Sequence, residues 1–183
     1  INYGFYKTSY GAKQDQVNAI ALCTGDVNVA SCRQCIYRST FVLQKRCPNQ
    51  KEAVIWYDNC MLRYSNRYFF GNMEFGPWFW MYNLKKVPNP GAFTRAVRSL
   101  LNTLILKAAS GSSRLKYATG FTTRSSPNIY ALVQCSPDLS KHGCITCLNN
   151  SIALLSKCCT GKQGGRFVAP NCNFRYETGR FYG

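Results

Sequence analysis

The positions of the cysteines constrain the fold of this chain more than any other sequence feature does. Five of them recur 112 residues later in the same order: Cys23, Cys32, Cys35, Cys47 and Cys60 correspond to Cys135, Cys144, Cys147, Cys159 and Cys172. A fixed period shared by five positions without a gap identifies a tandem repeat. The chain therefore consists of two modules built on one cysteine framework.

Similar sequences close the two copies, YFFG at residues 68–71 and RFYG at residues 180–183. They place the first module at residues 1–71 and the second at residues 72–183. By the same offset, residue 1 corresponds to Ser113, so residues 77–110 of the second module have no counterpart in the first. We therefore expect the first module to lack its first strand and helix and to expose an apolar face.

Each copy has the same succession of predicted elements. A β-branched run before the first cysteine (residues 17–22 and 129–134) predicts a buried strand, and a helical pattern follows at residues 29–46 and 141–157. Two strands close each copy, at 52–57 and 60–64 in the first and at 166–169 and 172–176 in the second. Between the copies, residues 77–82 are a strand-like aromatic run, and residues 90–109 form a helix capped by Asn89.

Spacings of three and four residues predict which side chains each helix buries. The expected inward positions are Cys35, Tyr37, Phe41 and Leu43 in the first helix, Cys147, Leu148, Ile152 and Leu155 in its counterpart, and Phe93, Val97, Leu100, Leu101, Leu104 and Ile105 in the helix between the copies.

Eleven cysteines in modules this small favour disulfides, and hence an oxidising compartment, over a zinc site. Each copy has one close cysteine pair and the chain has a single histidine, His142, whereas zinc sites usually need two such pairs. We expect neither a metal nor another cofactor. The order of the elements predicts the bridges Cys23–Cys32, Cys35–Cys60, Cys135–Cys144 and Cys147–Cys172. It leaves over Cys47, which is either free or paired between chains, and Cys158 and Cys159, which either bond to each other or stay reduced.

The charge and the scarcity of acidic residues narrow the function classes. The net charge is +16, which favours acidic partners such as cell-wall polymers or anionic surfaces. No arginine- or lysine-rich run or known motif points to specific nucleic-acid binding, and no apolar run is long enough to span a membrane. His142 has no acid or nucleophile near it in the sequence, and the seven acidic residues are scattered, so we expect no enzyme.

The residues around the cysteines resemble a known plant family. The first copy carries WYDNCMLRYSNR at residues 56–67, and the second carries VQCSPDL at residues 133–139, GKQGGR at 161–166 and CNFRYE at 172–177. With the C-x8-C-x2-C spacing, these segments resemble the ginkgobilobin-homologous domain, also called the salt-stress-response/antifungal domain. In tandem they are similar to cysteine-rich repeat secretory proteins and to the ectodomains of cysteine-rich receptor-like kinases.

The resemblance implies an α+β fold in which each module packs two helices on one face of a five-stranded antiparallel sheet. It also implies a mannose site made of an asparagine, an arginine and a glutamate. Arg166 and Glu177 match the last two in the second module, the asparagine has no match, and the first module has Val54 and Ser65 instead. The alternative, which the missing asparagine favours, is that Arg166 and Glu177 form a structural ion pair across adjacent strands.

Two kinds of function follow from the resemblance. One is a secreted, apoplastic defence or stress protein that binds mannose-containing glycans and acts against fungi. The other is the extracellular ligand- or protein-binding region of a receptor-like kinase or plasmodesmal protein. Residues 149–151 form an N-glycosylation sequon, so Asn149 is a candidate glycosylation site.

Overall fold

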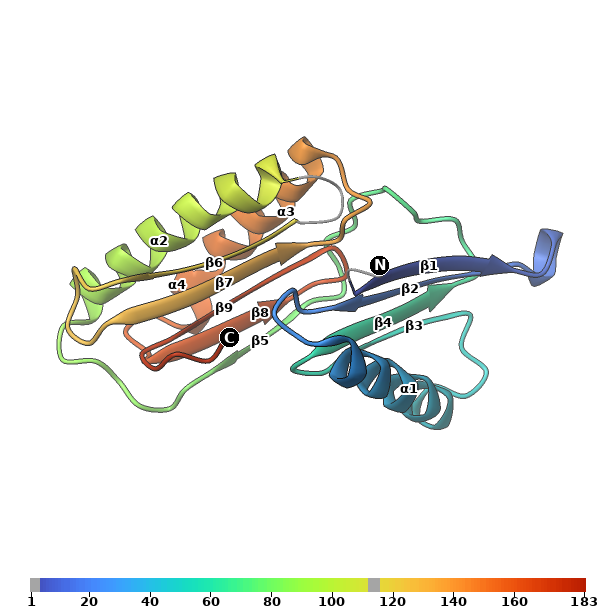
Figure 1. Ribbon diagram of the computed structural model, residues 1–183, viewed down its shortest axis with the longest axis horizontal. Helices are drawn as coiled ribbons and strands as arrows, with labels where there is room; N and C mark the ends of the chain where they lie inside the picture. The colour runs from blue at the N-terminus through green and yellow to red at the C-terminus, as the bar shows by residue number, and fades with distance from the viewer. Residues whose placement is uncertain (1–3, 112–115) are drawn as a thin grey trace. The chain divides into compact units, whose positions relative to one another are not determined.

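The computed structural model describes residues 4–111 and 116–183 of the chain. The chain divides into two compact units, Ile1–Asn72 and Met73–Gly183. Each contains one antiparallel sheet with its helices on one face, as Figure 1 shows. The fold is therefore α+β in two tandem modules, which confirms the fold class expected from the sequence.

The first unit has a four-stranded sheet and one long helix. Its elements are β1 (Phe5–Tyr10), the short 3-10 helix η1 (Lys13–Asp15), β2 (Val17–Cys23), α1 (Val29–Arg46), β3 (Glu52–Trp56) and β4 (Cys60–Ser65). The strands lie in the order β1-β2-β4-β3. Helix α1 begins after Asn28, whose side-chain oxygen accepts the backbone N–H of Ser31 at 2.9 Å, and Pro48 follows its end.

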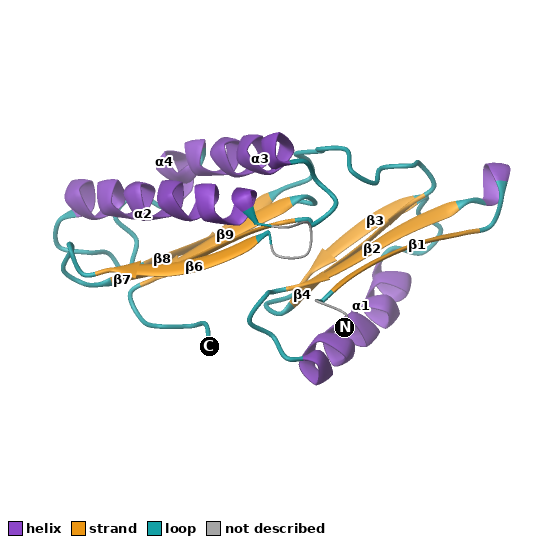
Figure 2. Cartoon of the chain, turned by 45° about the horizontal axis from the view of Figure 1, so that its top comes forward, coloured by secondary structure: helices purple, strands orange, loops and turns teal. Residues whose placement is uncertain are grey.

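The second unit has a five-stranded sheet and two long helices on the same face (Figure 2). Its elements are β5 (Phe79–Tyr82), α2 (Pro90–Ser110), β6 (Tyr117–Thr122), β7 (Ile129–Cys135), α3 (Lys141–Ala153), the single turn α4 (Leu155–Cys158), β8 (Gly164–Val168) and β9 (Cys172–Glu177). The strands lie in the order β5-β8-β9-β7-β6. Asn89 caps α2 as expected, because its side chain accepts the N–H of Ala92.

The cores of the two units differ in extent. In the second unit, α2 and α3 bury one continuous cluster against β6, β7, β8 and β9. All the inward positions expected of α2 and α3 are buried there, apart from a half-buried Leu100. In the first unit, the buried residues form two smaller clusters, one around Ile20, Leu22, Met61 and Phe69 and one around the cysteines.

Disulfides join α1 and α3 to the middle strands of their sheets. Cys23–Cys32 and Cys35–Cys60 tie the first two turns of α1 to β2 and β4, and Cys135–Cys144 and Cys147–Cys172 do the same for α3. A fifth bridge joins the neighbours Cys158 and Cys159, whose Cα atoms lie 3.7 Å apart. Cys47 is a free, half-exposed thiol.

Two sequence expectations about the helices are wrong. Tyr37 and Phe41 are 77% and 65% exposed rather than inward, because they lie on the side of α1 opposite its buried residues Ser39 and Leu43. Their counterparts Asn149 and Ala153 are exposed on α3 as well. The helix expected over residues 141–157 is interrupted at Leu154, which ends α3 before α4 begins.

Candidate functional site

Arg166 and Glu177 lie on the face of the second sheet that the helices do not cover. In the strand register, Arg166 of β8 is opposite Arg175 of β9, and Glu177 is opposite Gly164 of β8. Residues two apart on a strand share a face, so Arg166, Arg175 and Glu177 all point to one side. The alternate residues Phe174 and Tyr176 point to the other side and are buried in the core beneath α2 and α3.

Arg175 and Glu177 form an ion pair on this open face. Nε of Arg175 donates to Oε1 of Glu177 at 3.1 Å, and Nη2 of Arg175 lies 3.1 Å from the same oxygen. The two side chains are 34% and 24% exposed, and the guanidinium of Arg175 lies 4.5 Å over the ring of Phe181. Gly164 makes the room for Glu177, since a Cβ at that position would overlap the carboxylate. The face thus offers guanidinium donors beside a carboxylate acceptor, with an aromatic ring close by.

Sequence reasoning named Arg166 and Glu177 but missed Arg175. The structure puts Arg166 and Glu177 on one face, in diagonal positions of neighbouring strands, and makes Arg175 the residue that bonds to Glu177. The alternation of residues 175 and 177 along one strand is the signal that could have shown this pair.

The first unit carries a different polar arrangement on its corresponding face. Val54 and Ser65 occupy the positions of Arg166 and Glu177, and the carboxylate comes from Glu52, opposite Ser65. Oε2 of Glu52 accepts from Ser65 Oγ at 3.1 Å and from Arg67 Nη2 at 3.0 Å. The hydrogen bond from Arg67 lowers the pKa of Glu52. The two modules therefore do not repeat one site.

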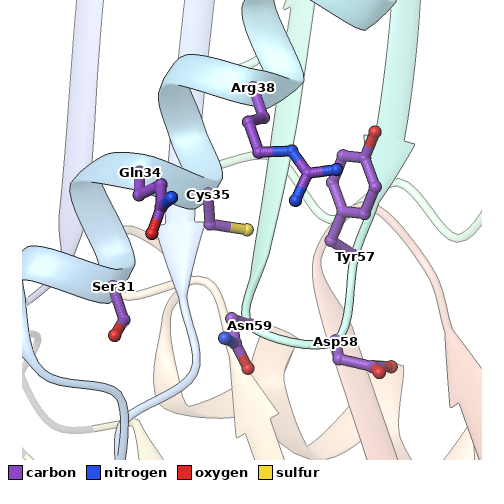
Figure 3. Close-up of a pocket in the computed structure, with 7 residues that line it drawn as sticks. All are labelled: Ser31, Gln34, Cys35, Arg38, Tyr57, Asp58 and Asn59. Carbon is purple, nitrogen blue, oxygen red and sulfur yellow. The ribbon is translucent and has the colours of Figure 1, made fainter.

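A polar pocket of about 280 Å³ lies at one end of α1 in the first unit (Figure 3). Figure 3 shows the side chains of Ser31, Gln34 and Arg38 on successive turns of the helix, facing residues 57–59 between β3 and β4. Its polar side chains include one cation, Arg38, and one anion, Asp58. The corresponding residues of the second unit are Gly143, Thr146, Cys147, Asn150, Ala169, Pro170 and Asn171. The charged lining therefore belongs to the first unit alone.

Other sequence-based candidates have definite places in the structure. Asn149 is exposed on α3, where its side chain is open to modification. His142 lies exposed in the first turn of α3, with its ring 3.5 Å from the hydroxyl of Thr146. Within residues 4–111 and 116–183, no group of three or more His, Cys, Asp or Glu residues is placed to hold a metal ion. No described helix has the length and hydropathy needed to cross a bilayer.

These features define a class of protein: a tandem, disulfide-stapled α+β protein with polar surface sites. The family described as salt stress response/antifungal matches residues 1–67 and 82–179. The chain belongs to this family, and it is an extracellular cysteine-rich protein.

Two relatives show how closely the chain follows the family. It is 42% identical over 174 residues to cysteine-rich repeat secretory protein 38 of Arabidopsis thaliana, covering 95% of this chain and 69% of that protein. It is 45% identical over 175 residues to an antimicrobial ginkbilobin-2-like protein of Castanea crenata, covering 95% of this chain and 72% of that protein.

Solved structures show the same tandem fold. The tandem DUF26 ectodomain of the Arabidopsis thaliana cysteine-rich receptor-like protein PDLP8 superposes with a TM-score of 0.81 at 23% identity, covering 95% of this chain and 81% of that one. The corresponding ectodomain of PDLP5 gives a TM-score of 0.74 at 22% identity, with coverage of 97% and 82%.

Proposed function

We propose that this chain is a secreted, non-enzymatic plant defence protein that binds mannose-containing glycans on the open face of its second sheet. The observation that carries the proposal is its 45% identity, over 95% of its length, to an antimicrobial relative. Arg166, Arg175 and Glu177 supply the chemistry that sugar recognition needs at one place. The net charge of +16 favours approach to anionic fungal or cell-wall surfaces.

The geometry of the face suits a polyhydroxyl ligand. Oε1 of Glu177 is already engaged by Arg175, which fixes the direction of the carboxylate and, within the described residues, leaves Oε2 as the available acceptor. Arg166 lies opposite Arg175 in the register, so its side chain is on the same side of the sheet as Glu177. Charged groups held in place in this way make stronger hydrogen bonds to hydroxyls than neutral groups do.

Calorimetric titration with mannose and with mannan tests the proposal. Saturable binding is expected for the native chain, with loss of about 1.5–3 kcal/mol of binding free energy in Arg166→Ala or Glu177→Gln, because each removes a charge-assisted hydrogen bond. Glu52→Gln is the matched control, since it alters the carboxylate of the first unit and should leave binding unchanged. Absence of binding by the native chain, or equal loss in the control, would rule out this site.

A second candidate function is recognition of an extracellular protein. The observation that favours it is the polar pocket of the first unit, whose charged residues have no equivalents in the second. Under this alternative, growth of a test fungus would be unaffected by the native chain, and Arg38→Ala would weaken capture of an apoplastic protein while Arg166→Ala would not. Inhibition of fungal growth that Arg166→Ala abolishes would decide for the glycan-binding function.

A further inference from the structure

The open face of the second sheet continues beyond Glu177 into two aromatic residues. The strand register places Glu177 of β9 opposite Tyr130 of β7, and Tyr130 opposite Phe121 of β6. Residues directly opposite each other lie on the same side of a sheet, so all three point away from α2 and α3. The neighbours of Tyr130 along its strand, Ile129 and Ala131, point the other way and are fully buried in the core.

The rings of Phe121 and Tyr130, here called the aromatic platform, stack on each other and are held in place. Their centroids lie 5.9 Å apart and their planes are 25° apart. The ring of Tyr182 meets that of Tyr130 edge-on at 6.4 Å, and the hydroxyl of Tyr182 donates to the backbone oxygen of Gly120 at 2.8 Å. Phe121 nevertheless remains 63% exposed, so the platform offers an apolar surface to solvent.

The first unit shows which features of this face belong to the common framework. In each unit an arginine of the last strand lies over a phenylalanine that follows it. The guanidinium of Arg63 lies 4.1 Å over the ring of Phe69, as that of Arg175 lies 4.5 Å over the ring of Phe181. This contact is therefore a shared part of the module.

The aromatic platform is not shared. The corresponding row of the first unit consists, in strand register, of Glu52, Ser65, Asn18 and Ser9. Ser9 Oγ donates to Asn18 Oδ1 at 2.7 Å, and Ser65 Oγ donates to Glu52 Oε2 at 3.1 Å, so these polar groups bond to one another. The module thus folds with a small, polar row at this position, and the fold does not require the exposed rings of the second unit.

We propose that the aromatic platform is a second sugar subsite, so that the open face binds a mannose-type oligosaccharide of two or more residues. One hexose bonds to Glu177 and Arg166, and the next lies with its apolar face on the ring of Phe121. Two strand spacings of about 4.8 Å each separate Glu177 from Phe121, a distance that a disaccharide can bridge. This inference rests on the glycan-binding function proposed above and adds chain length as a determinant of specificity.

The chemistry of the platform favours a neutral sugar ring. The face of an aromatic ring carries negative charge density, which attracts the polarised C–H groups on the flat side of a pyranose. Phe121 and Tyr130 are both uncharged, so they offer nothing specific to the carboxylates of an acidic polymer. Because the stacked rings are already held in place, little conformational entropy is lost when a sugar binds.

Calorimetric titration with mannose, α-linked mannobiose and mannotriose tests the inference. In the native chain, the affinity should rise by about tenfold from mannose to the longer sugars, because only these reach the ring of Phe121. Phe121→Ala should remove this rise and leave the affinity for mannose unchanged. The matched control is Phe41→Ala, since Phe41 is 65% exposed on α1 of the first unit, and it should change neither affinity.

Two further variants separate ring stacking from simple burial of apolar surface. Phe121→Trp should keep the rise in affinity, and its indole emission should shift on addition of mannotriose but not of mannose. Phe121→Leu retains an apolar side chain without a ring and should lose most of the rise. A leucine variant that binds mannotriose as tightly as the native chain would overturn the stacking subsite.

The outcomes distinguish this inference from the function on which it rests. Equal affinity for mannose and mannotriose, with loss of both in Arg166→Ala, would overturn the second subsite and support the mannose site alone. A rise with chain length for oligogalacturonides and not for mannosides would also overturn it, because the platform would then serve an acidic glycan. Absence of binding by every sugar in the series would rule out the glycan-binding function and the subsite with it.

Discussion

Tyr64 and Tyr176 are counterparts in the repeat, and replacing each by phenylalanine should have very different costs. Tyr176 is 1% exposed, and its hydroxyl lies 3.0 Å from the carbonyl oxygen of Cys159 and 3.3 Å from that of Lys162. Tyr64 makes one exposed bond, to the carbonyl oxygen of Gln50 at 3.1 Å. Only the first substitution removes a buried hydrogen bond, the one to Cys159, whose carbonyl oxygen keeps a second donor in the backbone N–H of Lys162 at 3.1 Å.

The magnitudes follow from these contacts. A net hydrogen bond contributes about 1 kcal/mol, and the hydroxyl of Tyr176 donates to two carbonyl groups, so Tyr176→Phe should lower the free energy of unfolding of the second unit by about 2 kcal/mol. Water can replace the hydroxyl of Tyr64, so Tyr64→Phe should cost the first unit about 0.5 kcal/mol or less.

Urea unfolding can be monitored by hydrogen exchange of peptides from β4 and from β9. Because β4 lies in the first unit and β9 in the second, this measures the stability of each unit separately. Equal losses in the two units, or a loss below about 0.5 kcal/mol for Tyr176→Phe, would refute the reasoning from buried carbonyls.

Three further outcomes are expected. Burial raises the pKa of Tyr176 above its ordinary value near 10, so this tyrosine's contribution to stability should be complete below about pH 10 and decline above it. Between pH 9 and pH 11, the midpoint of urea unfolding should therefore fall further in the native chain than in Tyr176→Phe. The double substitution Cys147→Ser with Cys172→Ser should lower the stability of the second unit by about 2–4 kcal/mol, because it releases a loop of 25 residues in the unfolded chain; an unchanged urea midpoint would contradict this. Gly164→Ala should displace the carboxylate of Glu177 from Arg175 at a cost of about 1 kcal/mol or less, because only a flexible side chain must move; a crystal structure of the variant that retained the ion pair would count against it.

Much of the fold was predictable because the cysteine repeat fixed the alignment of two segments. Once Cys23 and Cys135 were aligned, each strand or helix predicted in one copy had to agree with the pattern at the same position of the other copy. Asn89 and Pro90 marked the start of α2. The exposure of Tyr37 and Phe41 was not predictable from their spacing, because residues four apart share a helix face but do not show which face meets the sheet; in α1 that is the face of Ser39 and Leu43.

The candidate site was only partly predictable, for a physical reason. Arg166 and Glu177 could be named from the family pattern, but the partner of Glu177 depends on rotamers and on the space above Gly164, which no sequence spacing encodes. The polar pocket of the first unit brings α1 together with the turn after β3, two segments about twenty residues apart whose proximity depends on the packed sheet.

Because the disulfides lie near the start of α1, we expect its first turns to open less readily than its last turns. Cys32 and Cys35 hold the first two turns of the helix to β2 and β4, whereas Cys47, just past its last turn, is unbonded. Amide protons should therefore exchange progressively faster from Cys35 towards Arg46, because the anchored turns open only with the sheet and the distal turns can fray alone. In the second unit the disulfides hold the first two turns of α3, and the hydroxyl of Tyr176 donates to the carbonyl oxygen of Cys159 just past α4, so the helical segment is held at both ends. We therefore expect proteases to cut the last turns of α1 in the first unit more readily than α4 in the second.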